Sequence, residues 1–112
     1  MKKLTIKKWA LDDRPREKLV LKGKKSLSDA ELIAILIGSG SRNESAVSLS
    51  KKILLFANNN LNELAKLAVE ELTKFHGIGA AKAIAIITAL ELGKRRQLEL
   101  AMELPKVATS KG

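Results

Sequence analysis

The sequence contains no cysteine and a single histidine, His76. Disulfide bridges and thiolate metal sites are therefore excluded, and one histidine cannot supply a histidine-rich metal cluster. No apolar run approaches the roughly 20 residues that a membrane-spanning helix needs, and the basic start, residues 1–8, develops no signal-like apolar stretch. These absences argue against a self-contained metalloenzyme and against a membrane partner. They predict a cytoplasmic protein.

Aromatic residues are also scarce, since only Trp9, Phe56 and Phe75 are present. Three rings are too few for a base-stacking platform. Positive charge, by contrast, is abundant. The chain has 21 lysines and arginines and 12 acidic residues, which gives a formal net charge of +9 over 112 residues. Residues 1–25 alone hold ten basic and three acidic residues. A basic surface of this kind is expected to meet phosphates rather than bases.

Hydrophobic periodicity predicts an all-α chain, a compact bundle of about five to six helices with no competing strand pattern. Pro15 suits a first helical turn, with Asp13 as a possible cap and Gly23 as the end. Three domain parts follow from the pattern. They are a basic arm with a short helix (1–25), a helical domain (26–100) and a linker (101–112).

Further elements are marked by capping signals. Ser28 and Glu31 have capping-box spacing, and so do Asn60 and Glu63. We expect a largely buried helix over 29–37, a helix with its inward face at Ala46, Leu49, Ile53 and Phe56, a connector over 60–68, a helix over 69–75, and a long final helix. That last helix begins at Ala80, with Ala83, Ile84, Ile86, Ile87 and Leu90 inward.

Two units in this pattern look alike. Each is a helix, a Gly-x-Gly turn and a second helix, with turns at Gly38-Ser39-Gly40 and Gly77-Ile78-Gly79. One such hairpin cannot bury its own apolar faces, whereas two hairpins packed about a pseudo-twofold axis can. The sequence therefore predicts a tandem helix-hairpin-helix architecture, similar to the second domain of RuvA.

The second turn carries the sharpest chemical signal. Glycines let an incoming group approach the main chain without meeting a Cβ, and a helix start directs free amides and a favourable dipole at an anion. We predict a phosphate site at Gly77, Ile78, Gly79, Ala81 and Lys82. Main-chain donors and a lysine carry no base information, so binding without sequence preference is expected. Secondary contacts are predicted at Lys74, His76, Gly38, Ser39 and Gly40.

Three segments resemble the amino-terminal region of bacterial RadC-type proteins, a family described as DNA repair proteins. They are Arg14-Pro-Arg-Glu-Lys-Leu19, Leu27-Ser-Asp-Ala-Glu-Leu-Ile-Ala-Ile-Leu-Ile-Gly-Ser-Gly40, and Gly77-Ile-Gly-Ala-Ala-Lys-Ala83 with Glu91-Leu-Gly-Lys-Arg95. The resemblance runs from about Trp9 to Arg96. It implies a further, carboxy-terminal domain of the JAB/MPN type, a zinc-dependent peptidase-like fold that would be this chain's partner in cis. No residue here carries over the zinc site, so no catalytic residue, metal or cofactor is expected in this chain.

Two function classes stay open. The first is a non-catalytic module that binds the backbone of duplex or branched DNA and delivers an attached peptidase-like domain to DNA-associated substrates. The second is a protein-interaction or regulatory domain without nucleic-acid contact, which agrees with the polar Ser39 in the first turn. Neither class involves a small-molecule substrate. The unusual segment Arg14-Pro15-Arg16-Glu17-Lys18 predicts a docking role, either on this domain's own body or against the further domain.

Overall fold

The computed structural model describes residues 14–111, with side chains described from 14 to 103. This part of the chain forms six α-helices and a 3-10 turn, and it contains no strand. The all-α prediction is therefore confirmed. The elements are α2 (Pro15–Lys22), the 3-10 turn (Lys24–Ser26), α3 (Asp29–Ile37), α4 (Ala46–Phe56), α5 (Leu61–Ala65), α6 (Val69–Leu72) and α7 (Ala80–Lys111).

Helix caps are found at the positions that the sequence predicts. Pro15 occupies the first turn of α2, and Gly23 ends that helix with a φ of 91°; the candidate cap Asp13 lies outside the described residues. The Ser28 hydroxyl accepts from the Glu31 amide at 3.2 Å, and the Glu31 carboxylate accepts from the Ser28 amide at 2.8 Å. Both halves of the predicted capping box are present. The cap of α5 is also confirmed, since the Asn60 side chain accepts from the Glu63 amide.

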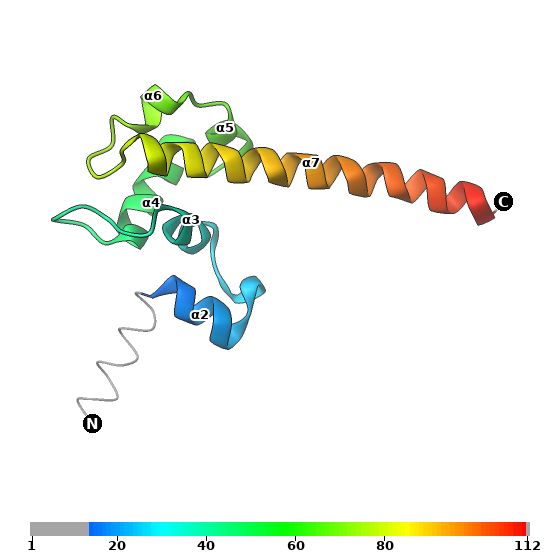
Figure 1. Ribbon diagram of the computed structural model, residues 1–112, viewed down its shortest axis with the longest axis horizontal. Helices are drawn as coiled ribbons and strands as arrows, with labels where there is room; N and C mark the ends of the chain where they lie inside the picture. The colour runs from blue at the N-terminus through cyan, green and yellow to red at the C-terminus, as the bar shows by residue number, and fades with distance from the viewer. Residues whose placement is uncertain (1–13, 112) are drawn as a thin grey trace.

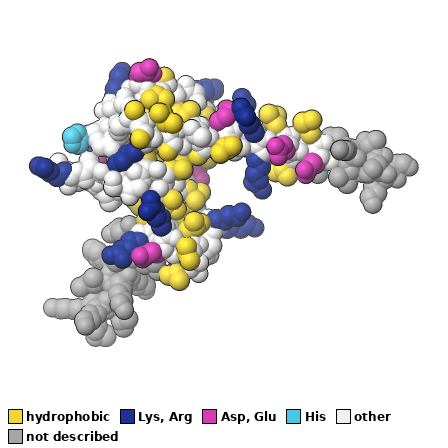
Figure 2. All heavy atoms as spheres, in the orientation of Figure 1, with side chains coloured by type: hydrophobic (Ala, Val, Ile, Leu, Met, Phe, Trp, Pro, Cys, Tyr) yellow, Lys and Arg dark blue, Asp and Glu magenta, His cyan; other side chains and the backbone are white. Residues whose placement is uncertain are grey.

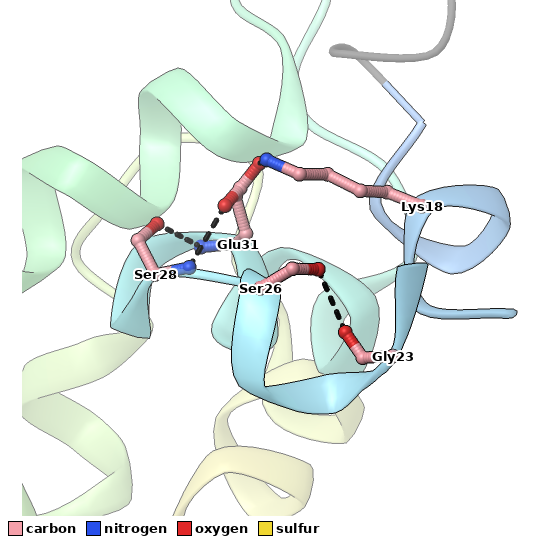
Figure 3. Close-up of polar contacts among 5 residues, drawn as sticks. All are labelled: Lys18, Gly23, Ser26, Ser28 and Glu31. Atoms are coloured by element: carbon pink, nitrogen blue, oxygen red, sulfur yellow. Dashed lines mark hydrogen bonds and ion pairs between the residues drawn. The ribbon is translucent and has the colours of Figure 1, made fainter. Parts of the chain in front are cut away.

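Glu31 also joins α3 to α2. The Lys18 ammonium lies 2.9 Å from the Glu31 carboxylate, and both side chains are largely buried. Figure 3 shows this pair beside the capping box. Burial raises the pKa of Glu31, but hydrogen bonds from Lys18 and the Ser28 amide outweigh burial and hold that pKa below its ordinary value. The pair docks the Arg14–Lys18 segment on this domain's own body.

The core lies between the first half of α7 and the shorter helices. Helix α7 contacts α3, α5 and α6, while α3 also packs on α4 and α2 (Figure 1). The most buried side chains come from α4 to α7, and each is at most 1% exposed: Leu49, Ile53, Leu64, Leu72 and Ile86. Burying side chains of this size stabilises the fold by about 1.5–3 kcal/mol each.

Several predicted core positions are wrong. Phe56 is 57% exposed at the end of α4, where its ring packs edge-on against Phe75, and Ile84 is 52% exposed on the outer side of α7. Leu32 and Leu36 of α3 are also exposed, so that helix is buried on one face rather than all round. Helix α6 ends at Leu72, three residues before the predicted end at Phe75.

The second half of α7 projects away from the core (Figure 1). Its backbone stays helical to Lys111, through the residues predicted as a linker, and the side chains of residues 91–103 are all exposed. Apolar and charged side chains both appear along this rod (Figure 2). A linker role for residues 101–112 stays a prediction, in a helical rather than an extended form.

Candidate nucleic-acid interface

The second turn joins α6 to α7 and has the geometry that its two glycines permit. Gly77 has a φ of 97°, in the region that favours glycine. Ile78 is 4% exposed, and its amide donates to the Phe75 carbonyl at 3.0 Å. Gly79 and Ala80 are exposed, and a Cβ on Gly79 would meet nothing within 4 Å. The turn is thus anchored by Ile78 and open to solvent at Gly79.

The start of α7 leaves its amides without partners. The first amide that donates to a backbone carbonyl there is that of Ala83, which bonds the Gly79 oxygen at 3.0 Å. The amides of residues 79–82 donate to no backbone carbonyl among the described residues 14–111. Helices α3, α4 and α5 differ, since Ser28, Ser45 and Asn60 accept from their first-turn amides. Helix α7 has Gly79 in the capping position, so its donors face solvent or a ligand.

The Lys82 ammonium lies between the two turns. It donates to the Ser39 carbonyl at 2.8 Å, to the Ser39 hydroxyl at 3.1 Å and to the Gly77 carbonyl at 3.0 Å. An ammonium has three N–H donors, so all three are engaged within the chain. No pattern in the sequence indicates this contact, which spans 43 positions. It places the positive charge beside the second turn and joins the two turns.

The first turn packs against the second. A Cβ on Gly77 would lie 2.9 Å from the Cβ of Ser41, so the two loops touch at this point. Gly38 has a φ of 78°, which matches the sign of φ at Gly77. The amides of Gly38 and Ser39 each bond a carbonyl of α3 at 2.9 Å, however. The first turn therefore offers fewer free donors than the second.

The remaining predicted contacts lie around the second turn. His76 and Lys74 are exposed, and Ala81 is exposed in the first turn of α7. Lys74 lines a shallow cleft of about 210 Å³ with Glu71 and the edge-on ring pair of Phe56 and Phe75. Gly40, the last predicted contact, lies instead in the first turn. Only glycine fits there, because a Cβ would collide with the Glu44 carbonyl.

Within the described residues, no three histidine, cysteine or acidic side chains gather as metal ligands would. None of the described helices combines the length and the apolar character needed to cross a membrane.

Comparison with known proteins identifies the family. The model of the family described as UPF0758 N-terminal matches residues 6–84. The chain belongs to the UPF0758 family. A UPF0758 protein of Flavobacterium johnsoniae is 62% identical over 106 residues, which cover 95% of this chain and 46% of that relative. A UPF0758 protein of Porphyromonas gingivalis is 47% identical over 93 residues, covering 82% of this chain and 41% of the relative.

The UPF0758 match agrees with the sequence resemblance at the level of family and of an amino-terminal domain. This chain spans less than half the length of these curated relatives. No solved structure matches the chain.

Proposed function

We propose that this UPF0758 domain is a non-catalytic module that binds the backbone of DNA without sequence preference, within a cytoplasmic, RadC-like protein of the DNA repair type. A phosphate is held at the Gly77-Ile78-Gly79 turn by the amides at the start of α7. The two turns act as tandem helix-hairpin-helix elements related by a pseudo-twofold axis.

One observation carries the proposal: α7 begins with unpartnered, exposed amides at an open glycine, whereas α3, α4 and α5 are capped by side chains. A phosphate at this point would accept from several amides and gain from the helix dipole. The Lys82 charge beside the turn adds to the attraction although its N–H groups are engaged. None of these groups reads a base edge, which supports backbone binding.

Binding to a labelled 20-base-pair duplex, followed by fluorescence anisotropy between 50 and 200 mM salt, tests this function. Neutralisation of roughly three to six phosphates gives an expected slope of log K against log salt of about −3 to −5. Gly79→Val places a branched side chain where the phosphate would approach, and we expect it to weaken binding about tenfold.

Gly93→Val is the matched control, because Gly93 lies in α7, the helix that Gly79 precedes, and a Cβ there also meets nothing within 4 Å. It should bind like the parent chain. Absence of binding at 50 mM salt, or equal affinity of the Gly79 and Gly93 variants, would contradict the proposed site.

A second candidate function is a protein-interaction or regulatory domain of a JAB/MPN metallopeptidase-like protein, with zinc held in that further domain. The observation in its favour is the projecting half of α7, which exposes four apolar side chains to solvent: Leu92, Leu98, Leu100 and Met102. The residues of this chain do not fit a zinc site, so the metal would belong wholly to the further domain. The salt titration separates the two functions, since this one predicts no duplex binding.

A further inference from the structure

A cleft of about 240 Å³ lies between the start of α2 and the first turn. Residues at the start of α2 line one side of it, namely Arg14, Pro15, Arg16 and Glu17, and Ala34, Ile35, Gly38 and Ala46 line the other side. The start of α2 is fixed in place, because Pro15 is buried and Lys18 pairs with Glu31 at 2.9 Å. The cleft therefore has charged side chains on one side, and on the other it has Gly38 of the first turn beside apolar side chains of α3 and α4.

The charged wall is positive on balance. Arg14 pairs with Glu17 at 3.4 Å, but the pair is long and both side chains are more than half exposed, so it adds little stability. Arg16 makes no ion pair or hydrogen bond with residues 14–103, and its Nη2 atom lies 3.6 Å from the position of a Cβ on Gly38. A guanidinium whose donors have no partner within the described residues, set over a glycine turn, is suited to a phosphate.

The cleft is connected to the second turn through a chain of contacts. Gly38 adjoins Ser39, which accepts from Lys82, and the same ammonium reaches the Gly77 carbonyl. Arg16, the first turn, Lys82 and the second turn are thus linked by successive contacts. A single small anion would occupy one end of such a chain of contacts, whereas a nucleic-acid strand carries a repeated series of phosphates that can occupy both.

We propose that Arg14 and Arg16 form a second phosphate-binding site, which holds the DNA backbone on the far side of the first turn from the start of α7. This inference rests on the proposed function and extends it. It gives the Arg14-Pro15-Arg16 segment a ligand-binding role in addition to its docking on α3.

Duplex binding by the double variant Arg14→Gln/Arg16→Gln tests the inference, with Lys94→Gln/Arg96→Gln as the control. The control removes the same charge from the exposed part of α7. We expect the Arg14→Gln/Arg16→Gln variant, called the α2 variant below, to lose about 10- to 100-fold in affinity near 100 mM salt. Because two phosphate contacts are lost, the slope of log K against log salt should become shallower by about 2. The control should stay within about twofold of the parent chain.

The outcomes separate this inference from the proposed function. If the α2 variant binds like its control while Gly79→Val is weakened, the second site is wrong and the first stands. If the α2 variant is weakened and Gly79→Val binds normally, the cleft is supported and the site at α7 is wrong. If the parent chain shows no binding at 50 mM salt, both proposals are wrong.

Discussion

Gly77→Ala should destabilise the domain by about 3 kcal/mol. Two effects add at this position. The φ of 97° is strained for any residue with a Cβ, which costs about 1–2 kcal/mol, and the added Cβ would lie 2.9 Å from Ser41 Cβ and 3.3 Å from Leu49 Cδ2, an overpacking that costs roughly 1–3 kcal/mol. The free energy of unfolding, measured by urea denaturation, gives the loss directly.

Gly79→Ala is the internal control for this experiment. Gly79 lies two residues away in the same turn, has no positive φ, and would present its Cβ to open space. We expect a change within about 0.5 kcal/mol, because the entropy that alanine removes from the unfolded chain offsets its poorer capping. Equal losses for the two variants would show that the turn packs differently from this structure.

Lys82→Met is expected to lower the free energy of unfolding by about 2 kcal/mol. The ammonium makes three hydrogen bonds to two turns, and charge-assisted bonds contribute about 1.5–3 kcal/mol. A lysine that only faced phosphate would leave stability unchanged when replaced. The urea midpoint of this variant therefore separates a contact between turns from a purely phosphate-facing side chain.

Lys94→Met serves as the comparison for Lys82→Met, since Lys94 is exposed on the projecting part of α7 and forms no ion pair within residues 14–103. Its stability should match that of the parent chain. Lys82→Arg should recover only part of the free energy of unfolding that Lys82→Met loses, because a planar guanidinium cannot place three donors on one atom. Full rescue by arginine would mean that charge alone, rather than the geometry of the contact, holds the turns.

Local features of this fold were predictable from the sequence because their causes lie within a few residues. The Ser28–Glu31 and Asn60–Glu63 caps, the end of α2 at Gly23 and the start of α7 at Ala80 are all set by neighbouring side chains and backbone. The burial of Ile78 is also a local feature. Ile78 is the one apolar side chain in the Gly77-Ile78-Gly79 turn, and it is 4% exposed.

Features that depend on packing between distant segments were not predictable. The Lys82 contact with Ser39 joins two loops, and no periodicity in one helix encodes it. A helical apolar pattern indicates that one face of a helix is buried, but it does not set the limits of that face. The exposure of Phe56 and Ile84 depends on which segments pack against α4 and α7. The cleft at Arg16 likewise arises from how α2 lies on α3 and the first turn.

The central claim is that the free amides at the start of α7 hold a phosphate of DNA. Titration of the ¹⁵N-labelled chain with the 20-base-pair duplex at 50 mM salt, followed by amide chemical shifts, tests it most directly. We expect the amides of Gly79, Ala80, Ala81 and Lys82 to shift most and to saturate together, while those of Gly93 and its neighbours keep their shifts. Saturable binding that leaves these four amides unmoved would contradict it.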